Sequence, residues 1–230
     1  MAAIAWHSGD GQSLHVKGKI IDSIATLSPE PKFSKAIAVF EIDQTKVKAL
    51  QALWEWLQAC EELAAKLHRG KATPARQEEL WRTMTCSLTG EGFPAPQRYS
   101  DYFRNYMEFM KTALEKFAEC LEESRTAPMG IQLEKDLPTI QHTESHAVIE
   151  ASLHRWSSRR RVCSTNNRRL TCVPKRARKG DIICVLFGGE VPYVLRPRED
   201  GSYSVFGECY VHDIMYGESL SHDTLSRVLN

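Results

Sequence analysis

The stretch between residues 160 and 212 constrains the fold more than any other part of the chain, because turn signals recur in it at short intervals. Four dipeptides there are typical of tight turns: Asn166-Asn167, Gly180-Asp181, Gly188-Gly189 and Asp200-Gly201. Between them lie short apolar runs, of which Ile182 to Phe187 is the longest. Strands joined by hairpins usually curl into a small barrel, because closure removes exposed edges. We therefore predict an antiparallel β-barrel-like module over residues 159–218.

The first 42 residues read as an extended segment. Leu14 to Lys17 alternate apolar and polar residues, and Ile20, Ile21 and Ile24 continue a β-branched stretch. We expect this N-terminal strand to pair with the C-terminal module and complete it. Pro192 predicts an edge position or a bulge for its own strand, because proline cannot donate to a ladder.

Residues 43–158 form the predicted helical region. Apolar residues recur there at steps of three and four, which indicates about four helices, near 43–69, 74–84, 98–123 and 144–157. In the first helix, the apolar stripe includes Leu50, Trp54, Leu57 and Ala64. Trp56 lies off this stripe, so we expect it either to pack against the third helix or to be exposed as an interface anchor. Thr73-Pro74 supplies a cap and a first-turn proline for the second helix. The predicted class is α+β, with residues 219–230 as a C-terminal tail.

Composition excludes several kinds of protein. The sequence has no run of 18 apolar residues and no secretory signal, so we expect neither a membrane span nor export. Its seven cysteines are scattered and none is in a CxxC pair, which favours reduced thiols without a structural zinc site. We predict a cytoplasmic protein, with the nucleus as the alternative.

Basic charge is concentrated in one segment. Residues 151–180 hold ten Lys or Arg and no acidic residue, while the rest of the chain carries 20 basic and 29 acidic side chains. We call the following side chains the basic belt: Arg159, Arg160, Arg161, Arg168, Arg169, Lys175, Arg176, Arg178 and Lys179. Such a belt binds nucleic acid, docks an acidic partner or neutralises acidic surface of the same protein. Only Trp156 lies near the belt in sequence, so aromatic stacking gives nucleic acid little support.

Two segments resemble the C-terminal region of fungal heterokaryon-incompatibility (HET-domain) proteins. Gly180-Asp181, Val185-Leu186, Val194-Leu195-Arg196 and Gly207-Glu208-Cys209-Tyr210-Val211-His212 follow the tail pattern of that family, and Trp81-Arg82-Thr83-Met84 resembles its upstream W-R-T-L. The family's T-x-x-G-x-x-G segment is here Thr165 to Thr171 with both glycines replaced, and Asp213 stands where glycine is usual. The N-terminal HET domain has no counterpart in this chain, so the resemblance does not carry over its cell-death activity.

The resemblance leaves six polar motif residues without a role that turn geometry explains: Asp181, Arg196, Glu208, Tyr210, His212 and Glu218. Cys209 and His212 invite a nucleophile–base reading, but on one strand they point to opposite faces. His142, His146, Glu150 and His154 recur every four residues, as metal ligands on a helix do, or as a solvated polar face does. We assign no catalytic residue, no cofactor and no metal.

The sequence therefore predicts a non-enzymatic interaction or regulatory module related to HET-domain proteins, acting in allorecognition or an immunity-like response. A truncated relative without an independent role is also consistent with it. We expect one or more protein partners. The alternative is a nucleic-acid-binding module that uses the basic residues between 155 and 179.

Overall fold

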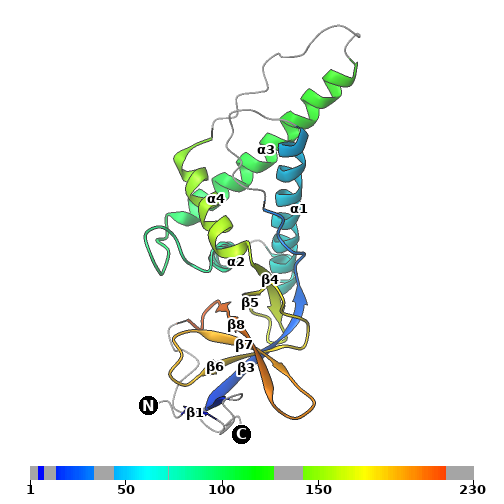
Figure 1. The fold of residues 1–230 in the computed structure, drawn as a ribbon. Coiled ribbons are helices and arrows are strands. Elements are labelled where there is room, and N and C mark those ends of the chain that lie inside the picture. The colour runs from blue at the N-terminus through cyan, green and yellow to red at the C-terminus, as the bar shows by residue number, and fades with distance from the viewer. Residues whose placement is uncertain (1–4, 8–13, 34–43, 72, 127–141, 216–230) are drawn as a thin grey trace.

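The change of apolar period after residue 43 marks the start of a helical layer that lies against one end of a curled sheet (Figure 1). The computed structural model describes residues 5–7, 14–33, 44–71, 73–126 and 142–215. These residues form an α+β protein, as predicted. The predicted boundaries at residues 42, 158 and 218 stay predictions, and the tail 219–230 lies outside the described residues.

Four helices occur in the described residues: α1 Gln44–Leu67, α2 Pro74–Met84, α3 Tyr99–Thr126 and α4 Glu144–Ser157. The expected start of α2 is confirmed, since the Thr73 hydroxyl accepts a hydrogen bond from the Arg76 amide at 3.2 Å and Pro74 fills the first turn. None of these helices is long and apolar enough to cross a membrane.

The buried face of α1 contains most of the predicted stripe but is wider than it. Leu50, Leu57 and Ala64 are buried as predicted and Trp56 is buried with them, whereas Trp54 is only partly buried. Trp56 therefore packs in the helical core and is not an exposed interface anchor. Its ring lies edge-on to Phe33, 5.5 Å away between centroids.

The strands form one seven-stranded antiparallel sheet in the order β8-β7-β6-β3-β4-β5-β9, and a separate two-stranded ribbon of β1 Ala5–His7 and β2 Leu14–Val16. The strands of the large sheet are β3 Gly18–Leu27, β4 Arg160–Thr165, β5 Leu170–Pro174, β6 Ile182–Leu186, β7 Pro192–Pro197, β8 Tyr203–Glu208 and β9 Tyr210–Val211.

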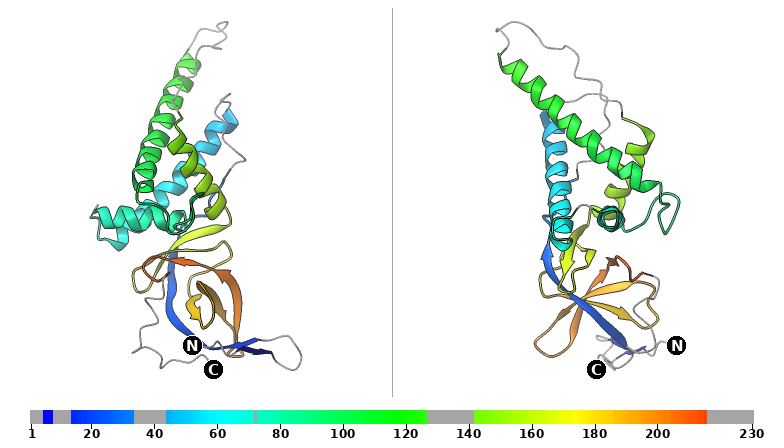
Figure 2. Two further views of the ribbon diagram at one scale, coloured as in Figure 1. Left: turned by 90° about the vertical axis from the view of Figure 1, so that its left-hand side faces the viewer. Right: turned by 180° about the vertical axis from the view of Figure 1, so that it is seen from behind.

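The N-terminal strand β3 lies at the centre of this sheet. It pairs with β6 on one side and with β4 on the other, so it joins two hairpin groups that are far from it in sequence (Figure 2). Gly18 starts β3 where space is short, because a Cβ there would lie 2.8 Å from the carbonyl oxygen of Val185. Register shifts after Ile20 and after Ile24 bend the strand.

The sheet curls but does not close into a barrel. No ladder joins its edge strands β8 and β9 within the described residues, although a single residue, Cys209, separates them in sequence. Gly207, at φ +129°, helps the chain bend as it leaves the β7 edge for the β5 edge. The predicted barrel is thus an open sheet whose edges are linked by the backbone.

Pro192 does not mark an edge, and the register shift of the β7–β8 ladder lies further on, between Val194 and Leu195. Pro192 is the first residue of β7, and β7 lies between β6 and β8 in the interior of the sheet. The first position of a strand tolerates proline because the missing N–H need not enter the ladder. The Pro192 carbonyl still contributes, since it accepts a hydrogen bond from the Cys209 amide at 2.8 Å.

Strands β4 and β5 are covered on both faces, which joins the two layers. Val162 belongs to the helical core, while its neighbour Cys163 belongs to the core inside the curled sheet. On β5, Leu170 belongs to the helical core and Val173 to the core inside the curled sheet. Side chains alternate along a strand, so one hairpin supplies apolar groups to both cores. Burying each of these aliphatic side chains stabilises the fold by about 1.5–3 kcal/mol.

Candidate functional site

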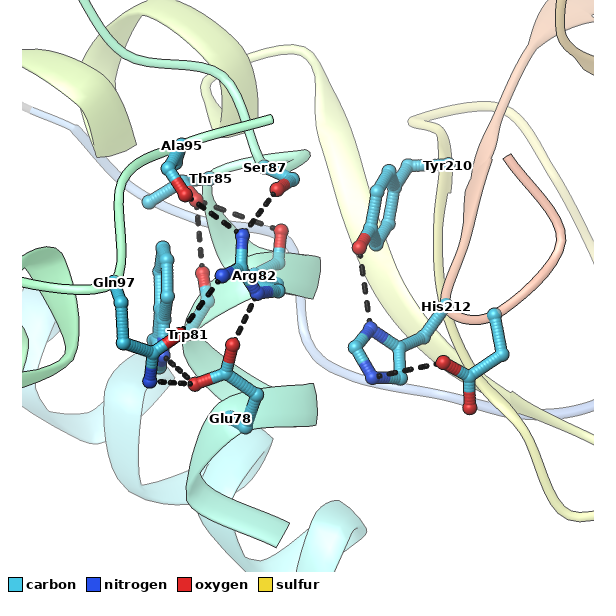
Figure 3. A network of polar contacts seen from close by, with 10 residues as sticks. Glu78, Trp81, Arg82, Thr85, Ser87, Ala95, Gln97, Tyr210 and His212 are labelled. Atoms are coloured by element: carbon cyan, nitrogen blue, oxygen red, sulfur yellow. Dashed lines mark hydrogen bonds and ion pairs between the residues drawn. The ribbon is translucent and has the colours of Figure 1, made fainter. Parts of the chain in front are cut away.

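The two motif segments of the sequence face each other where α2 packs on β5 and β5 pairs with β9 (Figure 3). Trp81 and Arg82 lie on α2, and Tyr210 and His212 lie about 130 residues later on and just after β9. The Glu79 carboxylate fixes α2 to the sheet by accepting a hydrogen bond from the Leu170 amide at 2.9 Å. This junction is the candidate functional site.

Arg82 is the centre of a polar network at the junction. Its guanidinium lies over the Trp81 ring, 4.3 Å from the centroid, and donates to the Glu78 carboxylate, to the Ser87 hydroxyl at 2.8 Å and to the Ala95 carbonyl at 2.9 Å. The Gln97 side chain accepts a further bond at 3.1 Å. One planar cation thus holds both the helix and the loop that follows it.

Glu78 is held as a carboxylate by the same network. Burial raises the pKa of Glu78, but hydrogen bonds from Gln97, Arg82 and Trp81 outweigh it and bring the pKa below the usual value. The Trp81 indole donates at 3.0 Å and the Gln97 amide at 2.8 Å. Glu78 therefore keeps its negative charge at neutral pH.

The turn after α2 is strained. Cys86 and Ser87 both have positive φ, 53° and 50°, in a region that side chains other than glycine rarely adopt. The Ser87 amide donates to the Arg82 carbonyl at 2.6 Å, and the Ser87 carbonyl accepts from the Ala95 amide at 2.8 Å. Strain of this kind persists only where surrounding contacts enforce it, and Arg82 supplies several of them.

Tyr210 and His212 face this network from the sheet. The Tyr210 hydroxyl lies 3.2 Å from His212 Nδ1, and His212 Nε2 lies 3.4 Å from the Asp213 carboxylate. Tyr210 packs with Cys86 and Cys172, and burial raises the pKa of its phenol. At neutral pH this phenol is a neutral hydrogen-bonding group.

Elsewhere in the sheet, the buried Asp181 forms an ion pair with the partly buried Arg196. The Arg196 guanidinium donates to both carboxylate oxygens of Asp181, at 2.8 and 2.9 Å, and lies 3.9 Å from the centroid of the Phe206 ring. Asp181 also accepts from the Arg178 amide at 2.8 Å. The Arg196 side chain additionally donates to the Arg176 carbonyl at 3.0 Å, so these two motif residues fasten the connection between β5 and β6 to β7.

The remaining motif residues are not brought to the junction. The Glu208 side chain is exposed, and its backbone carbonyl accepts a hydrogen bond from Arg160 at 2.7 Å. Glu218 lies outside the described residues. Of the six motif residues singled out from the sequence, the junction therefore contains Tyr210 and His212.

Cys209 and His212 do not pair, as the alternation of side chains along a strand predicts. Cys209 lies in the core of the curled sheet with Cys163 and Val211, whereas His212 contacts Tyr210 and Asp213. Burial raises the pKa of the Cys209 thiol well above its ordinary value. A thiol in this state is protonated at neutral pH and is a poor nucleophile.

The histidine series of α4 packs against α3 and the chain before α1. His146 stacks on Phe109 at 4.6 Å between centroids, His142 lies 3.4 Å from the Glu150 carboxylate, and His154 lies against Phe33 at 5.6 Å. No group of three His, Cys, Asp or Glu that could hold a metal ion occurs in the part of the chain that the structure describes.

About half of the basic belt is engaged by the protein itself. Arg161 and Arg168 donate to the carbonyls of Ser28 and Leu67, and Arg160 to that of Glu208. Arg169 and Lys175 pair with carboxylates, at 3.7 Å from Asp22 and 2.8 Å from Glu30. The exposed side chains of Arg159, Arg176, Arg178 and Lys179 make no ion pair among the described residues.

Fold and junction together define the class: an α+β protein in which a four-helix layer is docked on a curled antiparallel sheet. The model of the Het-6 β-barrel domain matches residues 14–226, which include both layers. The chain therefore belongs to the Het-6 β-barrel domain family, a domain associated with heterokaryon incompatibility, and the resemblance seen in the sequence is confirmed. No curated protein and no solved structure matches the chain.

Proposed function

We propose that this chain is a non-enzymatic interaction and regulatory module that acts in allorecognition or an immunity-like response. The observation that carries the proposal is the use of the motif side chains inside the fold. Arg82 binds the loop after α2, and Arg196 neutralises the buried Asp181. Because these side chains already bond to the protein itself, they stabilise its structure and are not available to react with a substrate. This favours a role in binding a protein partner, in the cytoplasm or the nucleus.

The first test measures partner binding in a fungal strain that expresses the chain. Crosslinked complexes of the wild-type chain are compared with those of Arg82→Lys, which keeps the charge but loses the planar fork, and of Arg104→Lys. Arg104 is a matched control because it is exposed and, within the described residues, its side chain hydrogen-bonds only to Asp101 of its own helix, at 2.6 Å. We expect one defined partner for the wild type and the control, and reduced recovery for Arg82→Lys.

The enzyme reading is tested by Cys209→Ala. Because the thiol is buried, we expect an incompatibility response equal to that of the wild type, scored at equal amounts of folded protein. A lost response from a variant with an unchanged unfolding midpoint would contradict the non-enzymatic proposal. An unchanged response together with no crosslinked partner for the wild type would contradict the interaction role.

A further inference from the structure

An open groove of about 430 Å³ lies beside β4, β7 and β8, away from the side chains of the junction network. Its size is within the range of about 300–1,000 Å³ that is usual for small-molecule sites. Strand pairing places Tyr193 of β7 directly opposite Glu208 of β8, and Arg159 and Arg160 enter from the start of β4. Neither the predicted module nor the family match assigns a role to it.

Two aromatic side chains line the groove. Tyr193 and Phe206 come from neighbouring strands, and both are partly exposed. Gly207 keeps the space between them and β5 open, since a Cβ there would lie 3.4 Å from Pro174 Cγ. Phe206 is already covered, because it packs against the core of the curled sheet and the Arg196 guanidinium lies 3.9 Å from its centroid. The partly exposed Tyr193 ring is therefore the one that remains for a planar ligand.

Two cations line the same groove. The Arg159 side chain is exposed and has no ion-pair partner in the described residues. Arg160 is held in place by its 2.7 Å hydrogen bond to the Glu208 carbonyl, which leaves other guanidinium N–H groups for a ligand. Guanidinium groups bind phosphate through paired hydrogen bonds, so the groove suits a phosphate.

The carboxylate of Glu208 limits which classes of ligand fit the groove. It is exposed at the groove and repels a ligand that carries only negative charge, but it accepts hydrogen bonds from hydroxyl or amino groups. An acidic peptide supplies charge without a planar ring and brings more carboxylates to Glu208. A nucleotide supplies a ring, a phosphate and the donors.

We propose that this groove binds a nucleotide, either free or as the terminal unit of a nucleic-acid strand. The base lies against Tyr193, the phosphate on Arg159 and Arg160, and a ribose hydroxyl or base amino group on Glu208. This assignment goes beyond the proposed interaction role and does not depend on it.

The test is calorimetric titration of the full chain with adenosine 5′-monophosphate, ribose 5-phosphate, adenosine and inorganic phosphate. Because base stacking and phosphate contacts each contribute, we expect the nucleotide to bind about tenfold more tightly than any of the other three. Equal binding of ribose 5-phosphate and the nucleotide would overturn the proposal, and so would no heat from the nucleotide at millimolar concentration.

Variants separate the contacts. Arg159→Ala is expected to weaken the nucleotide and ribose 5-phosphate alike, by about tenfold, whereas Tyr193→Leu weakens only the nucleotide. Glu208→Gln is expected to strengthen phosphate binding and to reduce the preference for the nucleotide. Lys179→Ala, in the basic belt but outside the groove, leaves all affinities unchanged. If Tyr193→Leu fails to fold, Arg159→Ala still tests the proposal, because Arg159 is exposed: nucleotide affinity unchanged in Arg159→Ala would overturn it.

A single-stranded oligonucleotide of about ten residues, with and without a 5′-phosphate, distinguishes the two sources of nucleotide. Tighter binding of the 5′-phosphorylated strand, lost in Arg159→Ala, supports the site with a strand end as its ligand. Tighter binding of free nucleotide supports it with a small molecule. Strand binding that is indifferent to Arg159→Ala and Tyr193→Leu overturns the proposal.

Discussion

Two buried carboxylates, Asp22 and Asp181, each hold a turn of the sheet through backbone N–H groups. Asp22 accepts from the Asn167 amide at 3.2 Å in the β4–β5 hairpin, and Asp181 accepts from the Arg178 amide before β6. Each also has an arginine nearby, Arg169 at 3.7 Å and Arg196 at 2.8 Å. The Asp181 pair has the better geometry, because both carboxylate oxygens are bonded.

Removing Arg196 tests the value of that pair. Arg196→Met leaves a buried carboxylate with only one backbone donor, so we expect a loss of about 2–3 kcal/mol in the free energy of unfolding, reduced from the fully buried case because Arg196 is partly solvated. Urea denaturation measures it. Arg198→Met is the control, since its pair with Asp200 is exposed and 3.8 Å long, and should change stability by less than about 0.5 kcal/mol. Equal losses in the two variants would contradict this role.

At the scale of the element, the start of α4 depends on the neutral form of His146. Its Nδ1 accepts a hydrogen bond from the Thr143 amide at 3.2 Å, and its ring stacks on Phe109 of α3. Burial and the nearby His142 lower the pKa of His146. Protonation at Nδ1 would replace the acceptor by a donor and break the cap.

The stability of the chain should therefore fall as pH drops below about 6.5, where the unfolded histidine gains a proton that the folded one does not. The loss is complete below the lowered folded pKa. His146→Gln keeps an acceptor for Thr143 but does not titrate, so its stability profile should be flatter, by about 1 kcal/mol between pH 7.5 and 5.5. Urea denaturation across this range measures the difference.

The titration of Glu150 changes stability with pH in the opposite direction. Its effect is removed by subtracting the stability profile of His146→Gln from that of the wild type. Burial raises the pKa of Glu150, against the attraction of His142 and His154, so its contribution to stability is lost as pH rises. Because Glu150 is present in both proteins, the difference between them isolates His146. Parallel profiles would show that this cap does not sense pH.

Local signals predicted the elements well, because caps and turns depend on neighbouring residues. Thr73-Pro74 gave the start of α2, and the glycine positions of the family pattern are explained at residues 168 and 213, where Arg168 and Asp213 both have φ +63°. The stripe of α1 was predicted, since Leu50, Leu57 and Ala64 are buried, but the greater burial of Trp56 than of Trp54 was not. Trp56 packs against Phe33, and helical periodicity does not reveal such a long-range contact.

At the scale of the whole molecule, two arrangements could not be read from the chain. The expected pairing of the N-terminal strand with the module is confirmed, but hairpin signals do not reveal that β3 inserts between β4 and β6 at the centre of the sheet. The placement of Tyr210 opposite the Arg82 network follows from the sheet topology, because β9 pairs with β5 and α2 packs on β5. The W-R-T segment pointed to Arg82, but not to the part of the sheet that the Arg82 network faces.

The central place of β3 predicts that the β-module does not fold alone. Without β3, the groups β4-β5-β9 and β6-β7-β8 share no ladder in the described structure, and Ile24 leaves the core that they enclose. A fragment of residues 159–218 should show no cooperative unfolding and little amide protection in hydrogen exchange, since the lost ladders expose strand edges. Adding a peptide of residues 14–33 should restore protection to β4 and β6. The same peptide with Gly18→Ala should do so less well, because its Cβ would meet the Val185 carbonyl. A fragment that unfolds cooperatively by itself would show that the two hairpin groups hold together without the strand between them.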